Sequence, residues 1–250
     1  MFRYHAPVWR IDTLDRNDQP GRPGRGTDGQ LQCQLEPVVF THLAFSYVQG
    51  VIQPQLVYLT WFAARSAESW LDIYAGALDG LVWRVTLDDQ GRVLVYDSIH
   101  PCGCYHQWLL VKGGLRPRPT VNLSAEHLWV LGELSENSGP PVLSLSTGDH
   151  QLVGIQFAEG GAEAPARRVG RPYHIEPLDQ LRGRSWAGGR LYAFDGLIAG
   201  TERLERFLLW PTGVVSAGAM RQWGHHAVSF VGRRHFDDPN LLDQYFRLPR

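Results

Sequence analysis

The stretch Leu81-Val82-Trp83-Arg84-Val85-Thr86-Leu87, followed by Asp88-Asp89-Gln90-Gly91 and by Val93–Ile99, decides the fold. Its first run alternates large apolar residues with mixed ones, which is the period of a β-strand with two different faces. The tetrapeptide consists of turn formers and ends in a glycine that can adopt a positive φ, so we predict a β-hairpin. The residues expected to face the core are Leu81, Trp83, Val85 and Leu87.

Other strand-like segments flank this hairpin. They are rich in β-branched and aromatic residues and cover 38–47, 55–62, 142–145 and 151–157. Helical spacing appears only later, where Leu204, Phe207 and Leu208 share one face before Pro211. The sequence therefore predicts an α+β, β-rich fold with a mostly antiparallel sheet core and short helices in the C-terminal third.

A second helix is expected near the C-terminus. Asp238 is suited to cap it and Pro239 to occupy its first position. The apolar stripe that follows would dock this helix on the sheet, and it consists of Leu241, Leu242, Tyr245 and Phe246.

The chain has 250 residues, of which 44% are hydrophobic, and this is enough to bury one substantial core. We predict a single globular domain over 1–250, with a β-rich lobe at 31–157 and an α+β lobe at 171–250. The small and charged residues of 158–170 separate the two lobes. Two Pro-Gly pairs predict an irregular arm over 12–30.

The charge balance limits the classes of partner. Lys plus Arg is 24 and Asp plus Glu is 25, so the formal net charge of -1 provides no general attraction for nucleic acid or an anionic membrane. We therefore expect a small-molecule or protein partner and no nucleic acid. No apolar run is long enough for a membrane span. The N-terminus lacks secretory-signal features, which favours the cytoplasm unless a leader was removed.

The segment His100-Pro101-Cys102-Gly103-Cys104-Tyr105-His106 contains the densest group of chemically reactive side chains in the chain. Thiolates and imidazoles are the preferred ligands of zinc and copper, and here two of each lie within seven residues. A straight strand would spread them over roughly 20 Å. Because Pro101 and Gly103 favour a bend, we predict that a folded loop gathers three of the four ligands.

A remote histidine would complete the surroundings of the ion. His226 is the first choice, because one ring of the adjacent pair His225-His226 must face the core if that segment is extended. Asp97 lies close enough in sequence to orient a ligand histidine. The lower-ranked candidates are His235, His42 and His174.

Two other interpretations of the cysteines stay open. Cys102 and Cys104 could form a vicinal disulfide, or they could be small buried side chains beside hydrogen-bonded histidines. The third cysteine, Cys33, makes the number odd, and the spacing does not fit covalent haem attachment. Glu202 and Glu205 are interleaved with arginines, which favours a salt-bridged surface over paired catalytic carboxylates.

These alternatives give two hypotheses of function. The first is a metal-dependent hydrolase in which zinc or copper is bound by residues from the set His100, Cys102, Cys104 and His106, with His226 or Asp97 as the acid-base group. The second is a non-catalytic binding or interaction module with a structural metal or a vicinal disulfide. The sequence lacks the zinc-helix, phosphate-loop, nucleophile-elbow and dinucleotide motifs of other enzyme classes.

Three segments also resemble a group of bacterial proteins. They are 78–87, 100–106 and 224–238, and the resemblance covers most of the chain. It implies no activity and no functional residue.

The metal hypothesis predicts that protein purified without added metal carries about one equivalent of zinc or copper. Because thiolates must lose protons to bind the ion, the metal should be released as the pH falls. Elemental analysis of the wild type and of the double variant Cys102→Ser, Cys104→Ser measures this. A negligible metal content in the wild type would contradict it.

Overall fold

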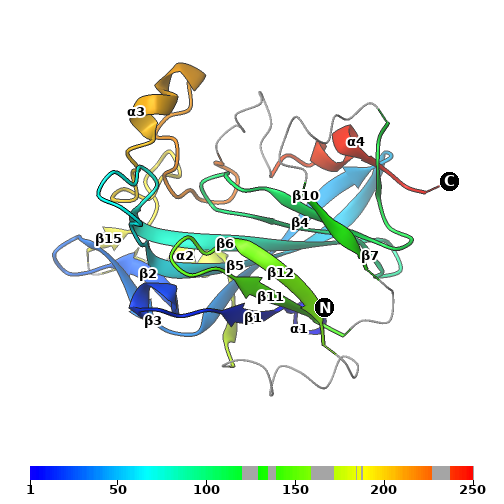
Figure 1. Ribbon diagram of the computed structural model, residues 1–250, viewed down its shortest axis with the longest axis horizontal. Coiled ribbons are helices and arrows are strands. Elements are labelled where there is room, and N and C mark those ends of the chain that lie inside the picture. The colour runs from blue at the N-terminus through cyan, green and yellow to red at the C-terminus, as the bar shows by residue number, and fades with distance from the viewer. Residues whose placement is uncertain are drawn as a thin grey trace.

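The computed structural model describes residues 1–119, 129–134, 139–158, 172–183, 185–186, 188–226 and 237–249. Within these ranges the chain forms a nine-stranded sheet with a three-stranded sheet beside it, and short helices lie mostly in the C-terminal part (Figure 1). This agrees with the predicted β-rich α+β fold. No helix in the described ranges is long and apolar enough to cross a membrane.

The nine-stranded sheet is built around the long strands β5 and β6. Its strand order is β10-β8-β7-β6-β5-β2-β3, and β4 pairs with β5 while β13 pairs with β4. All pairs are antiparallel except β10 with β8 and β13 with β4. The strands are β2 (Pro20–Arg25), β3 (Leu31–Leu35), β4 (Val38–Val48), β5 (Val51–Arg65), β6 (Gly76–Leu87), β7 (Val93–Ile99), β8 (Gln107–Val111), β10 (Trp129–Leu134) and β13 (His174–Pro177).

The remaining elements are short. The three-stranded sheet consists of β1 (Val8–Ile11), β11 (Pro141–Leu145) and β12 (Leu152–Phe157), and two small pairs are β9 (Arg116–Pro117) with β16 (Phe246–Arg247) and β14 (Ser185–Trp186) with β15 (Gly189–Arg190). The helical segments are α1 (Phe2–His5), η1 (Arg16–Asp18), α2 (Asp179–Gly183), α3 (Arg206–Leu209), η2 (Trp210–Thr212) and α4 (Leu241–Tyr245).

The predicted hairpin is confirmed as β6 and β7. Its turn is closed by the Asp88 amide, which donates to the Arg92 carbonyl at 2.8 Å, and Gly91 has a φ of 78°. The Asp88 side chain also accepts hydrogen bonds from the Gln90 and Arg92 amides. The four residues expected to face the core are each at most 1% exposed: Leu81, Trp83, Val85 and Leu87.

The second face of β6 is also buried, although its sequence is mixed. Trp83 packs in a core shared with Leu143 of the three-stranded sheet, whereas Val82 packs in a core shared with Phe246 near the C-terminus. The sheet is therefore covered on both sides. Arg84 and Thr86 follow Val82 on this face and have almost no exposure, so their polar groups need partners inside the protein.

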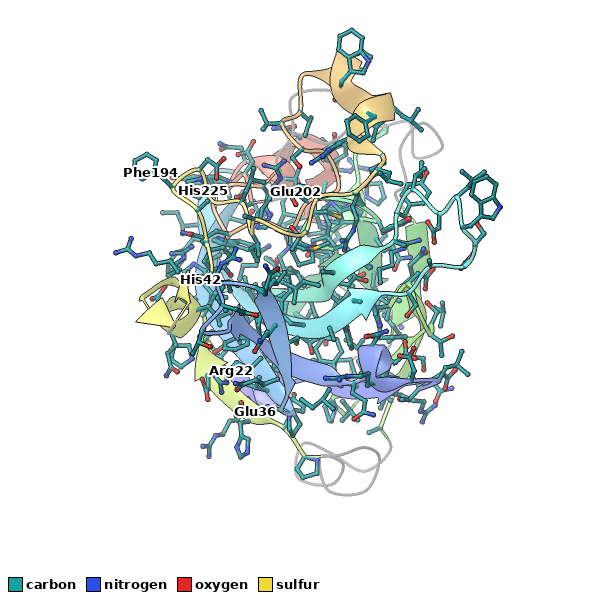
Figure 2. The ribbon with its side chains drawn as sticks, turned by 90° about the vertical axis from the view of Figure 1, so that its left-hand side faces the viewer. Arg22, Glu36, His42, Phe194, Glu202 and His225 are labelled. Atoms are coloured by element: carbon teal, nitrogen blue, oxygen red, sulfur yellow. The ribbon has the colours of Figure 1, made fainter. Side chains whose placement is uncertain are left out.

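The prediction of an irregular arm over 12–30 is wrong for its second half, because β2 occupies Pro20–Arg25. Arg22 explains how this Pro- and Gly-rich segment is held. Its guanidinium donates two hydrogen bonds to the Glu36 carboxylate and two to the Glu176 carboxylate, at 2.6–3.0 Å. Figure 2 shows Arg22 beside Glu36 at the edge of the molecule. These ion pairs tie β2 to Glu36, which lies just before β4, and to Glu176 in β13.

The helix predicted over 201–208 is reduced to the four residues of α3. Its expected apolar stripe is exposed, with Leu204, Phe207 and Leu208 between 55% and 66% accessible. The buried residues of this segment are instead Thr201, Arg203 and Glu205. Arg203 donates to the main-chain carbonyls of Ala77 and Leu78. Burial of this arginine, which an amphipathic pattern does not anticipate, holds the segment in a non-helical path.

The C-terminal stripe does dock on the sheet, since Leu241, Leu242 and Phe246 are at most 3% exposed. The capping prediction is wrong, however. The N-cap of α4 is Asn240, and Asp238 lies two residues before this N-cap, where its carboxylate accepts a hydrogen bond from the Asn240 amide at 2.8 Å. Asp238 therefore shapes the turn that leads into α4.

The hairpin core leads to a prediction for stability. Trp83→Ala should reduce the free energy of unfolding by about 3–5 kcal/mol, because it leaves a cavity between the two sheets. Trp70→Ala is the matched control, since Trp70 is 89% exposed and should tolerate the change. Urea unfolding measures both, and similar small losses would show that Trp83 does not support the core.

Candidate functional site

The 100–106 segment lies between β7 and β8 and bends as expected. The Gly103 amide donates to the His100 carbonyl at 2.8 Å, and the His100 amide donates to the Cys104 carbonyl at 3.0 Å. Gly103 has a φ of 92° and Tyr105 a φ of 57°, so the chain turns sharply at both positions. This turn brings the side chains of Cys102 and Cys104 together.

The thiols of Cys102 and Cys104 are close enough to shift each other's pKa in opposite directions. The side-chain hydrogen bond with Cys104 lowers the pKa of Cys102, and the charge of nearby His100 acts in the same direction against the effect of burial. The same hydrogen bond, together with burial, raises the pKa of Cys104. Cys102 is buried and Cys104 is partly exposed, and neither is in a disulfide. The proton is therefore held more tightly at Cys104 than at Cys102.

His100 is held by a buried carboxylate. Its Nδ1 lies 3.2 Å from Asp79 Oδ1, and both residues are at most 2% exposed. Burial by itself would lower the pKa of His100, but the charge of Asp79 outweighs this and raises it. The other ring nitrogen, Nε2, is buried and has no hydrogen-bond partner. The imidazole is therefore fixed in orientation, and Asp79 favours its positively charged form beside the thiols.

His106 belongs to a different cluster. Its Nε2 lies 2.8 Å from Asp97 Oδ2, and the same oxygen accepts a hydrogen bond from Arg84 Nε at 2.7 Å. Asp97 is fully buried, and although burial alone would raise its pKa, the Arg84 charge and the His106 hydrogen bond lower it. Asp97 does orient a histidine, as expected from the sequence, but it also neutralises a buried arginine.

The two histidines among the four expected metal ligands thus turn to different carboxylates. His100 turns to Asp79, and His106 turns to Asp97. Across the ranges that the structure describes, no three His, Cys, Asp or Glu side chains are grouped to hold a metal ion. The zinc or copper site therefore stays a prediction from the sequence.

His226 lies next to the 100–106 segment, which we call the thiol loop. It is buried, and its Nδ1 is 3.1 Å from the Pro101 carbonyl oxygen. Its neighbour His225 is exposed, so one ring of the pair faces inward as expected. His225 lies near Phe194 at the surface (Figure 2). The lower-ranked His42 packs near Trp223, with ring centroids 5.9 Å apart, and His174 is exposed on β13. His235 lies outside the described residues.

Three charged residues close to the thiols were not singled out as site residues by the sequence. The charges of Arg203 and Arg221 interact with Cys102, and the charge of Glu205 interacts with Cys104. All three are at most 8% exposed. Burial raises the pKa of Glu205, so its proton is held more tightly than in solution. The salt-bridged surface expected for Glu202 and Glu205 is therefore wrong for Glu205, whereas Glu202 is exposed and accepts a hydrogen bond from the Gly200 amide.

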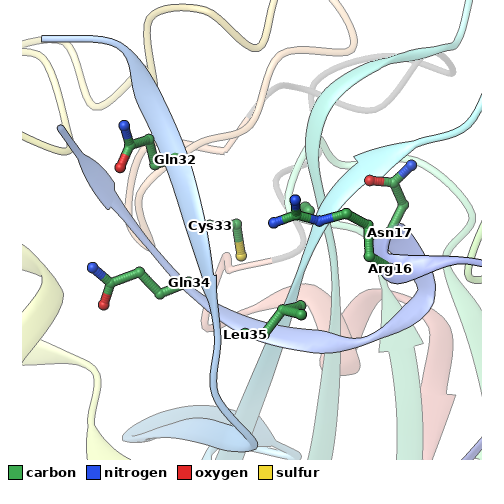
Figure 3. Close-up of a pocket in the computed structure, with 7 residues that line it drawn as sticks. Arg16, Asn17, Gln32, Cys33, Gln34 and Leu35 are labelled. Carbon is green, nitrogen blue, oxygen red and sulfur yellow. The ribbon is translucent and has the colours of Figure 1, made fainter. Parts of the chain in front are cut away.

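A surface pocket lies elsewhere, against η1, β3 and β5 (Figure 3). Its lining is mainly polar and contains none of the residues around the 100–106 segment. Cys33 lines it, but burial raises the pKa of this thiol to about 12, so Cys33 remains protonated near neutral pH. The lining residues are Arg16, Asn17, Gln32, Cys33, Gln34, Leu35 and Ala63.

Comparison with known proteins adds little. No family model matches the chain, and no curated protein sequence matches it. A solved structure described as "Toxin fold for microbial attack and plant defense" has 10% sequence identity, with 71% of this chain and 85% of that chain covered. Its TM-score of 0.34 is too low to support a shared fold or function.

The Arg84–Asp97 cluster leads to a second stability prediction. Asp97→Asn should cost roughly 3–5 kcal/mol of unfolding free energy, because it removes the buried carboxylate charge that pairs with the Arg84 guanidinium. The exposed pair between Arg92 and Asp88 is the control, and Arg92→Ala should cost less than about 1 kcal/mol. Equal losses in chemical unfolding would mean that burial does not make Asp97 essential.

Proposed function

We propose that the protein acts through Cys102 and Cys104 as a redox-active thiol pair that exchanges with a disulfide of low molecular weight. The observation that carries this proposal is the tight turn that closes between His100 and Cys104 and holds two cysteines, one buried and one partly exposed, each of which shifts the pKa of the other. A small disulfide is the substrate class that suits the limited exposure of Cys104.

The exchange begins with the pair sharing one proton. Transfer of that proton from Cys104 to Cys102 along their hydrogen bond leaves the more accessible sulfur as the nucleophilic thiolate. Cys104 then attacks the substrate, forming a mixed disulfide and releasing the first thiolate of the substrate. Cys102 gives its proton to that thiolate, attacks the Cys104 sulfur and releases the second thiolate. The products are one protein disulfide and two reduced substrate molecules, one of them protonated.

The surrounding charges support this chemistry. The His100 imidazole, held by Asp79, and the guanidinium groups of Arg203 and Arg221 favour the negative charge that the pair carries before it attacks the substrate. A cytoplasmic location would keep the pair reduced and ready to react, whereas an oxidising compartment would favour the disulfide. The pair needs no metal for this reaction.

The proposal predicts a stoichiometry. With an aromatic disulfide that releases a coloured thiolate, the wild type should release about two equivalents per protein, and Cys102→Ser should release about one because it stops at the mixed disulfide. Cys104→Ser should react far more slowly. Cys33→Ser is the matched control and should behave as the wild type, because the thiol of Cys33 stays protonated.

Elemental analysis of the same preparation tests the alternative. About one equivalent of zinc or copper, lost in the cysteine variants, would replace the redox pair with the metal site expected from the sequence. A metal-free wild type that releases no coloured thiolate would also contradict the redox proposal and favour the binding module. A metal-free protein that releases two equivalents supports it.

A further inference from the structure

Asp79 is the centre of a buried chain of acidic and imidazole side chains that extends well beyond the thiol loop. The Nδ1 atom of His100 lies 3.2 Å from Asp79 Oδ1, and the Nδ1 atom of His150 lies 2.8 Å from Asp79 Oδ2. On the far side, His150 Nε2 lies 3.3 Å from Asp18 Oδ1, which is an ion-pair separation without hydrogen-bond geometry. We call Asp18, His150, Asp79 and His100 the carboxylate–imidazole chain.

His150 has a rigid setting. Its side chain is fully buried, and its ring stacks on Phe62 with centroids 3.9 Å apart and planes 3° apart. It sits in the turn between β11 and β12 with a φ of 51°, a left-handed conformation that a histidine rarely adopts. A conformation of this kind persists only where the surroundings hold it, which here are Phe62 and the two carboxylates.

Asp18 anchors the turn that carries His150. Its Oδ1 accepts a hydrogen bond from the Gly148 amide at 2.7 Å, and its Oδ2 accepts one from the Leu14 amide at 2.8 Å. The chain therefore links four separate parts of the protein: η1, the β11–β12 turn, strand β6 and the thiol loop. These links leave the imidazole of His150 little freedom to move.

The Asp79 carboxylate depends on this arrangement. It is 1% exposed, and each of its oxygen atoms is hydrogen-bonded to one imidazole ring. The nearby charges of Arg65 and Arg203 also interact with it. If His150 were lost, Oδ2 would lose its hydrogen bond and the carboxylate could rotate, so its direction toward His100 would no longer be set.

We infer that His150 is a positioning residue for the thiol pair: it holds the Asp79 carboxylate in the orientation that fixes the His100 imidazole beside Cys102. This inference deepens the proposed function and rests on it for its effect on reactivity. The orientation of His100 itself can be measured without any reaction.

The test compares two polar replacements of His150. Asparagine places an amide nitrogen near the position of Nδ1, so His150→Asn should keep the hydrogen bond to Asp79. Glutamine places its amide nitrogen near the position of Nε2, so His150→Gln should keep a donor facing Asp18 and lose the one to Asp79. Nuclear magnetic resonance of the His100 Nδ1 proton and nitrogen reports the His100–Asp79 hydrogen bond directly. Release of coloured thiolate from the aromatic disulfide reports reactivity.

We expect the His100 signals to be near those of the wild type in His150→Asn and clearly shifted in His150→Gln. Thiol–disulfide exchange with the aromatic disulfide should be about tenfold slower in the glutamine variant only. Leu143→Ala, which removes a buried side chain from β11, controls for lost stability and should leave the His100 signals in place. Unchanged His100 signals in His150→Gln would overturn the inference. If they shift while the wild-type pair itself is unreactive, the positioning role stands and the proposed redox function fails.

Discussion

The need to neutralise charge inside a sheet that is covered on both faces is the constraint on which this structure depends. Strand β6 has almost no exposed surface, yet it carries Asp79 and Arg84. An isolated buried charge is costly, so each of these residues requires partners from other elements. Arg84 takes Asp97 from β7, and Asp79 takes His100 and His150 from two different loops. Satisfying these charges fixes how the layers meet.

The thiol pair is a consequence of the same constraint. Because His100 must reach Asp79, the chain turns as soon as β7 ends, and the turn places Cys102 and Cys104 against one another. The Cys104 thiol and the charge of His100 then lower the pKa of Cys102, which burial alone would raise. Two neighbouring histidines of one segment consequently have different surroundings, since His106 serves the Arg84–Asp97 pair instead.

Two local predictions were wrong because long-range ion and hydrogen-bond partners outweighed local pattern. The segment 12–30 reads as irregular, but Arg22 binds Glu176, a residue 154 positions away, and this contact supports a strand. The segment 201–208 reads as an amphipathic helix, but Arg203 binds a carbonyl 126 positions away and turns the charged side inward. Both partners lie at least 126 positions away, so a pattern read over neighbouring residues does not include them.

The sequence by itself determined the β6–β7 hairpin, the β-rich class, the docking of the last helix, the bend of the 100–106 loop and the inward direction of His226. Each of these follows from apolar periodicity or from turn residues, which act over a few positions. Only the tertiary structure decided that Asp79 is the centre of the site. Its partners Asp18, His100 and His150 are remote from one another in the chain and meet because two sheets and a loop pack together around one buried carboxylate. Hydrogen bonds of that kind depend on three-dimensional position, for which local sequence carries no signal.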